Sequence, residues 1–188
     1  MNNAQRLAIL NKSNKTTFSA KYLINLWGVK KESFNIVIKR MVDRGLLFRI
    51  ARGYYSLRED FNIYELANIV ITPSYISFNC ALSYHGVAFQ ASQEIESAAL
   101  INYKRKIADY TLKYFTLKKE LSLNLEGIEH LENFSIATPE RAILDCLYLN
   151  MHPNIDNLEK VNKLRLQNLL KYYPQSVKNK IKDFLNSF

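Results

Sequence analysis

Two arginines flank a turn in the segment RIARGYYSL, which runs from Arg49 to Leu57. A guanidinium group carries a permanent charge and a fork of N–H donors, so it suits contact with phosphate oxygens. Gly53 follows Arg52 and is a residue type that tight turns favour. We therefore predict phosphate or minor-groove contacts for Arg49 and Arg52, with Gly53 setting the turn conformation.

A second group of polar side chains precedes this turn, in the segment KKESFNIVIKRMVDRG. Its apolar residues recur at helical spacing, so the opposite arc of a helix should face solvent. On that arc, Lys and Arg suit phosphates or guanine, Asn35 suits adenine, and Ile36 suits a thymine methyl group. The residues that we predict to bind DNA here are Lys30, Lys31, Ser33, Asn35, Lys39 and Arg40.

Short helices must position these groups. The helical spacing of apolar residues over 2–12 predicts a first helix, with Arg6 in solvent. A second helix is expected to begin after Ser19 as N-cap and to end at Gly28. The basic helix follows and should end at Gly45. Two short helices joined by a tight turn are typical of a helix-turn-helix, and the hairpin after them predicts the wing of a winged helix.

The charge of the chain is divided unevenly along its length. The net charge of +9 separates into +10 over residues 1–58, −6 over 59–156 and +5 over 157–188. A short segment that repels itself so strongly is typical of proteins that bind a polyanion. We therefore expect a DNA-binding domain over residues 1–60 and a second domain over residues 61–188.

The second domain is predicted to combine a small sheet with covering helices. A helix is expected from about Phe61, another over Tyr75–Gly86 with Ser77 as N-cap, and a third after Thr138 as N-cap. Two basic helices should follow, separated at Pro174. The fold class is thus α+β, with an N-terminal winged helix-turn-helix and a C-terminal α+β domain. The expected strands are residues 97–103, 113–117, 121–127 and 134–138.

Three residues of the second domain could suggest catalysis but are better explained by structure. His85 has no nucleophile placed beside it by the sequence, so we interpret it as a structural histidine near a helix end. Glu140 and Asp145 are five residues apart and diverge on a helix, so helix capping and solvation explain them better than acid–base chemistry. We predict no catalytic residues.

The composition of the chain narrows the classes of protein that it could belong to. The two cysteines, Cys80 and Cys146, lie in apolar helical patterns and are predicted to be free, buried thiols. The glycines form no phosphate-binding loop, and no Cys or His spacing suits zinc, so we expect no enzyme activity, cofactor or metal. Without a long apolar run or a signal-peptide core, the chain is expected to be cytoplasmic, with no membrane partner.

Three stretches together resemble the AbiEi family, the antitoxins of type IV toxin–antitoxin systems linked to abortive phage infection. They are RGLLFRIARGYYSL, YISFNCALSYHG and IATPERAILDCLYL, and their order and spacing extend the resemblance over nearly the whole chain. The resemblance implies an N-terminal winged helix that represses its own operon by binding double-stranded operator DNA, which we expect to contain inverted repeats. It also implies a C-terminal domain that counteracts a nucleotidyltransferase toxin similar to AbiEii, without a stable complex between the two proteins.

By this resemblance, Lys31, Asn35, Lys39 and Arg40 match the recognition helix, whereas Arg49, Arg52 and Gly53 match the wing. Two alternatives stay open. The chain could be an orphan transcription regulator whose acidic middle part senses a ligand or mediates assembly. It could also be a nuclease with a winged targeting domain. The C-terminal basic helices could extend the DNA-binding surface or simply be solvated.

Overall fold

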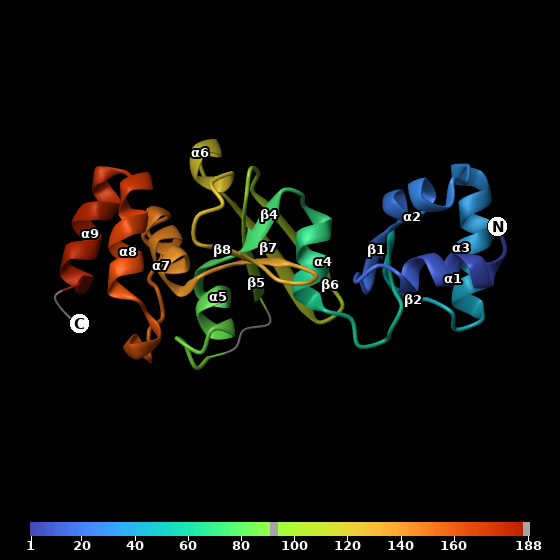
Figure 1. Cartoon of the computed structure of the whole chain (residues 1–188), viewed down its shortest axis with the longest axis horizontal. Helices are drawn as coiled ribbons and strands as arrows, with labels where there is room; N and C mark the ends of the chain where they lie inside the picture. The colour runs from blue at the N-terminus through green and yellow to red at the C-terminus, as the bar shows by residue number, and fades with distance from the viewer. Residues whose placement is uncertain (91–93, 186–188) are drawn as a thin grey trace. The chain divides into compact units, whose positions relative to one another are not determined.

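The computed structural model describes residues 1–90 and 94–185, with side chains as far as Lys182. The last residues of the expected second domain, 186–188, lie outside the described residues. The chain is a mixed α+β protein (Figure 1). It divides into two compact units, Met1–Val70 and Ile71–Phe188.

The first unit contains four helices and a three-stranded antiparallel sheet within the described residues, with the strands in the order β1-β3-β2. The expected helix order and the hairpin after the third helix are both present. The elements are α1 (Asn3–Asn11), β1 (Thr17–Ser19), α2 (Ala20–Trp27), α3 (Lys31–Asp43), β2 (Phe48–Ala51), β3 (Tyr54–Ser56) and α4 (Ile63–Val70).

Local signals set the helix ends in this unit. The Ser19 hydroxyl accepts a hydrogen bond from the Tyr22 amide at the start of α2, which confirms the predicted N-cap. Helix α2 ends at Gly28, also as predicted. The core of the unit holds an aromatic chain in which the Phe34 ring lies 6.1 Å from Trp27 and 6.3 Å from Tyr55, measured between centroids.

Three features of the first unit differ from expectation. Arg6 is buried rather than solvated, because its guanidinium group packs over the Trp27 ring. The guanidinium carbon lies 5.7 Å from the ring centroid. Strand β1 was not expected, and it pairs with β3. The unit also ends at Val70 rather than at residue 60, since the buried Glu65 of α4 accepts hydrogen bonds from the amide and the hydroxyl of Thr16.

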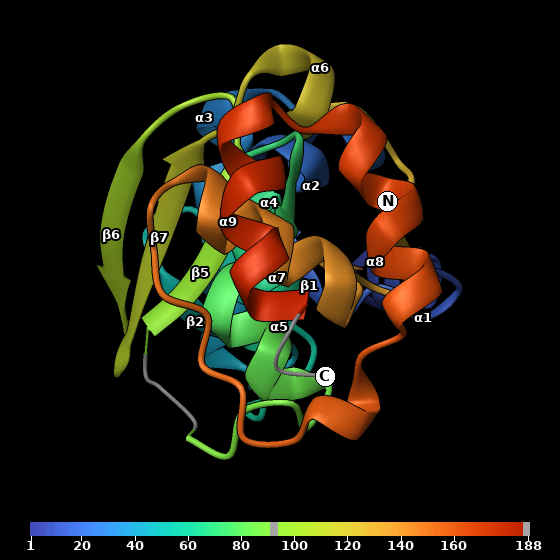
Figure 2. The same ribbon diagram turned by 90° about the vertical axis from the view of Figure 1, so that its left-hand side faces the viewer.

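The second unit is built on a six-stranded mixed sheet with the strand order β6-β7-β5-β4-β9-β8. Helix α5 packs on β5 and on α7, and Figure 2 shows α7 and α9 in front of the strands. The elements are β4 (Ser74–Ile76), α5 (Phe78–Tyr84), β5 (Glu94–Ala99), β6 (Tyr103–Ile107), β7 (Tyr110–Thr116), α6 (Lys119–Ser122), β8 (Ile128–His130), β9 (Ser135–Ala137), α7 (Pro139–Tyr148), η1 (Leu158–Lys160), α8 (Lys163–Leu169), η2 (Leu170–Tyr172) and α9 (Gln175–Leu185).

The sheet is larger than the small sheet that we predicted, and one predicted strand is wrong. Residues 121–127 alternate in polarity, but they form the end of α6 and a turn. Helix α5 begins at Phe78 with Ser77 in the N-cap position, as predicted, and Tyr75 before it lies in β4. Within the sheet, β4 pairs with β9 in parallel, and β5 pairs with β7 in parallel.

Other expectations for the second unit are confirmed. The Thr138 hydroxyl accepts from the Arg141 amide at the start of α7, with Pro139 in the first turn. Cys80 and Cys146 are buried thiols and belong to no disulfide in the described part of the chain, as predicted. Among the described residues, no helix combines the length and the apolar character needed to cross a membrane.

Candidate nucleic-acid interface

Helix α3 is oriented by its apolar side. Phe34, Ile38 and Met41 are at most 5% exposed and face the core of the first unit. The orientation that we predicted for this helix is therefore confirmed. Lys30 occupies the N-cap position with no side-chain cap hydrogen bond, and the helix ends at Asp43.

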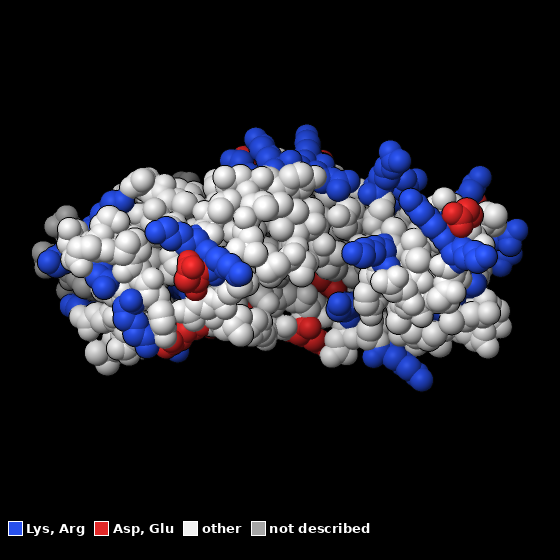
Figure 3. Space-filling view, turned by 90° about the horizontal axis from the view of Figure 1, so that it is seen from above, with Lys and Arg blue, Asp and Glu red and all other residues white. Residues whose placement is uncertain are grey.

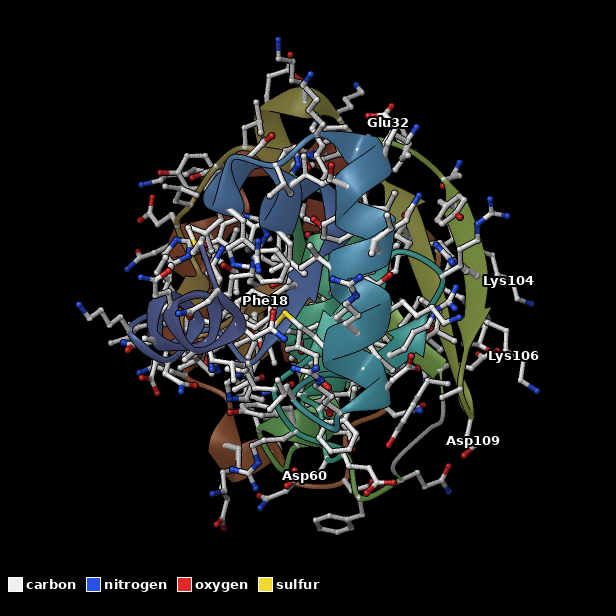
Figure 4. The ribbon with its side chains drawn as sticks, turned by 90° about the vertical axis from the view of Figure 1, so that its right-hand side faces the viewer. Phe18, Glu32, Asp60, Lys104, Lys106 and Asp109 are labelled. Atoms are coloured by element: carbon white, nitrogen blue, oxygen red, sulfur yellow. The ribbon has the colours of Figure 1, made fainter. Side chains whose placement is uncertain are left out.

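The opposite side of α3 carries the predicted polar residues. We call Lys31, Asn35, Lys39 and Arg40 the outer face of α3, and all four are exposed. Lys30 and Ser33 are exposed beside it. In Figure 4, α3 stands at the front of the view, with Glu32 labelled near its start. Ile36 is 56% exposed on the same side, so its side chain is accessible to a ligand.

The β2–β3 hairpin follows α3 and holds the two arginines. Arg49 lies opposite Tyr55, and a register irregularity separates it from Ala51. Both Arg49 and Arg52 are exposed. Gly53 completes the turn with φ +89°, a backbone conformation that a side chain would strain.

Packing joins the hairpin to the helices. Tyr55 is buried and its ring meets Phe34 of α3 edge-on, so the hairpin packs against the helices. The Gly53 carbonyl accepts a hydrogen bond of 2.7 Å from the Ala20 amide at the start of α2. The turn that carries Arg52 is thus attached to the same framework that orients α3.

The electrostatic character of this unit follows from its composition. Figure 3 shows many more Lys and Arg than acidic side chains on the visible surface of the first unit. In the part of the chain that the structure describes, no ion pair involves Lys31, Lys39, Arg40, Arg49 or Arg52. Their charges are therefore compensated by solvent and salt, and they remain accessible to an anionic ligand.

A buried polar network in the second unit escaped the sequence analysis. Asp145 of α7 is fully buried, and we call it and its donors the Asp145 network. Its Oδ1 accepts from the Tyr173 hydroxyl at 2.6 Å and from Arg141 Nε at 3.2 Å. Its Oδ2 accepts from the hydroxyls of Tyr75 at 2.9 Å and Ser77 at 2.7 Å. The expectation that Asp145 is solvated is wrong.

The remaining donors of Arg141 are hydrogen-bonded to backbone carbonyls and to the Tyr75 hydroxyl. Its Nη2 donates to Leu121 at 2.6 Å, and its Nη1 donates to Glu126 at 3.1 Å. Burial lowers the pKa of this guanidinium, but the Asp145 charge and the two tyrosines outweigh that effect and raise it. Burial raises the pKa of Tyr75 and of Tyr173 well above 10, and the neighbouring Asp145 charge acts in the same direction.

Glu140 and His85 also have structural contacts. Glu140 is 2% exposed rather than solvated, and its Oε1 accepts from the Asn162 amide at 2.7 Å. His85 Nε2 lies 2.9 Å from the Ala137 carbonyl oxygen, so the imidazole connects the end of α5 to β9. The i,i+4 spacing of Arg141 and Asp145 was the one sequence signal for the network.

Comparisons with known proteins add no identification. A scan against protein-family models found no match, and a search of the curated proteins found none. The described residues contain no group of three or more His, Cys, Asp or Glu that could hold a metal ion. The geometry of the molecule itself therefore has to support any functional proposal.

Proposed function

We propose that the first unit is a winged helix-turn-helix that binds double-stranded DNA. The observation that carries this proposal is the outer face of α3, where an asparagine stands among exposed basic residues on a helix held from behind by a buried aromatic core. Helices α2 and α3 form the helix-turn-helix, and the β2–β3 hairpin is the wing.

The chemistry divides between the two elements. Asn35 carries an amide that can pair bidentately with adenine, and Ile36 offers an apolar contact to a thymine methyl group. Arg49 and Arg52 extend from the hairpin and contact phosphates or the minor groove. Lys39 and Arg40 add charge at the end of α3. The helix reads sequence and the hairpin contributes affinity.

A gel-shift titration at several salt concentrations tests the proposal. If about five phosphates are neutralised per protomer, log affinity falls against log salt with a slope near −4.5. The double variant Lys39→Ala/Arg40→Ala should weaken binding and flatten this slope. Lys12→Ala removes a charge from the same unit at the end of α1, outside the residues of α3 and the hairpin, and serves as the matched control. A salt-independent affinity would refute the proposal.

The wider proposal is that the chain is the antitoxin and autorepressor of a toxin–antitoxin operon, with no catalysis of its own. It rests on the AbiEi-like stretches. One structural fact bears on them: the second and third stretches meet in the Asp145 network, through Tyr75, Ser77, Arg141 and Asp145. The buried contacts of these residues hold the two stretches together within the second unit. We therefore assign antitoxicity to the accessible surface of that unit.

Co-expression separates this proposal from its main alternative, an orphan regulator. The chain should restore growth of cells that express a neighbouring nucleotidyltransferase gene. A variant with Lys39→Ala/Arg40→Ala should still restore growth while losing repression of the operon promoter. If the chain represses its promoter but never restores growth, the orphan regulator is the better description.

A further inference from the structure

The segment from the edge strand β6 to the start of α6 holds most of the positive charge of an acidic part of the chain. Residues 59–156 have a net charge of −6, yet six of their seven basic residues lie between 104 and 119. The seventh is Arg141, which is fully buried in the Asp145 network. Figure 4 shows Lys104 and Lys106 extending outward along β6, with Asp109 beyond them at the turn.

The register of β6 and β7 places an aromatic ring on the same face of the sheet as these lysines. Lys104 lies opposite Lys113, and side chains two residues apart on a strand share a face, so Lys106 and Phe115 are on the same side of the sheet. The two strands line a shallow pocket of about 450 Å³. Its lining residues are Asn102, Tyr103, Lys104, Lys113, Tyr114 and Phe115.

Contacts within the unit hold this pocket in place. The Phe115 ring meets Phe78 of α5 edge-on, with 5.2 Å between centroids. Lys113 Nζ is 2.5 Å from Glu94 Oε2, and Asn102 Oδ1 accepts from the Thr116 amide at 2.9 Å. The exposed lysines Lys104 and Lys106 have no ion pair among the described residues.

We propose that this edge binds single-stranded nucleic acid, with an unstacked base against Phe115 and the adjoining phosphates at Lys104 and Lys106. Phe115 is half-buried and lines the open pocket. A basic track beside an accessible aromatic ring is the arrangement that single strands recognise, since any base can stack and the backbone follows the charge. A duplex keeps its bases stacked inside and cannot fill the pocket. The site is formed by residues of the second unit, whereas α3 belongs to the first, and the proposal does not depend on the proposed duplex binding.

Fluorescence anisotropy with the full chain tests the site. The probes are short labelled oligouridylate and oligothymidylate, and a duplex of equal length is the comparison. Loss of two phosphate contacts in Lys104→Ala/Lys106→Ala should reduce the salt slope by about 1.4, which is about 25-fold in affinity at 0.1 M salt. Phe115→Leu should weaken binding by at least about 5-fold. The matched control Lys160→Ala should bind like the wild type.

Photocrosslinking with 5-iodouridine locates the contact, and mass spectrometry should find the crosslinked peptide within residues 102–115. Binding of both oligonucleotides identifies the shared single-strand chemistry, and preference for the uridylate identifies RNA. Circular dichroism checks each variant, and the exposed Lys104 and Lys106 carry the test if Phe115→Leu unfolds. The proposal is overturned if neither oligonucleotide binds or if Lys104→Ala/Lys106→Ala binds them like the wild type. It is also overturned if that variant loses affinity for the duplex instead, or if the crosslinks fall within residues 31–53.

Discussion

Arg141 and Asp145, one turn apart on α7, form an ion pair of 3.2 Å in which both side chains are fully buried. Such a pair stabilises a fold only when hydrogen bonds satisfy its remaining donors and acceptors. Here the hydroxyl groups of Tyr75, Ser77 and Tyr173 donate the further hydrogen bonds to Asp145. The pair therefore connects elements that are distant along the chain.

Removing one partner of this pair should destabilise the second unit strongly. Asp145→Ala leaves the Arg141 charge buried without its counterion, and we expect the free energy of unfolding to fall by about 3–5 kcal/mol. Urea unfolding followed by circular dichroism measures the change. The exposed pair Arg58 and Asp60 offers the control, because Asp60→Ala should leave stability unchanged within error. Equal effects of the two substitutions would contradict the prediction.

Alkaline pH should weaken the same unit. The folded-state pKa of Tyr75 and of Tyr173 lies above the ordinary value of 10.0, so the folded state retains protons that the unfolded chain loses. Their stabilising contribution is complete below about pH 10 and declines as the pH rises above it. Denaturant unfolding at a series of pH values measures this slope, which should be shallower in Tyr173→Phe. An unchanged slope in that variant would assign the alkaline loss to other groups.

The two cysteines should resist thiol reagents in the folded protein. Burial raises the pKa of Cys146, and the Asp145 charge adds to that effect, so little thiolate forms at neutral pH. Cys80 is 8% exposed. Reaction with a chromogenic disulfide should release no colour from the native chain and two equivalents in denaturant. Rapid reaction of the native chain would show that α5 and α7 open readily.

The first unit should require α4 for its stability. A fragment of residues 1–60 lacks Glu65, whose carboxylate holds the amide and hydroxyl of Thr16, whereas residues 1–70 retain it. In the full chain, Glu65→Ala should cost about 1–3 kcal/mol, because it leaves a part-buried donor without its partner. Thermal unfolding compares the two fragments, with the exposed Glu59→Ala as the control. A 1–60 fragment as stable as 1–70 would make α4 dispensable.

If the first unit binds DNA as proposed, substitutions of Asn35 and Arg52 should reduce duplex affinity in different ways. Asn35→Ala should cost about 1–3 kcal/mol on a duplex that the chain selects from random sequence, and almost nothing on unselected duplex. Arg52→Ala should weaken both duplexes alike, since phosphate contacts carry no sequence information. Anisotropy titrations on the two duplexes give the four affinities. Parallel losses for both variants would abolish the division between helix and hairpin.

Elements with local signals could be predicted from the amino-acid sequence. Ser19 and Thr138 begin their helices as predicted, and the side of α3 that faces the core follows from the helical spacing of Phe34, Ile38 and Met41. Exposure of Lys39 and Arg40 could be predicted for the same reason. Capping and periodicity act over a few residues, so a single stretch of sequence contains them.

Only the tertiary structure decided the features that depend on distant partners. Leu121, Leu123 and Leu125 alternate like a strand, but only Leu121 becomes buried, and none of the strands in the described residues pairs with them. Asp145 is fully buried because Tyr75 and Tyr173, 70 and 28 residues away, bring their hydroxyl groups to it. A buried charge is tolerated only where such partners converge, and that convergence arises when the chain folds rather than from its local pattern.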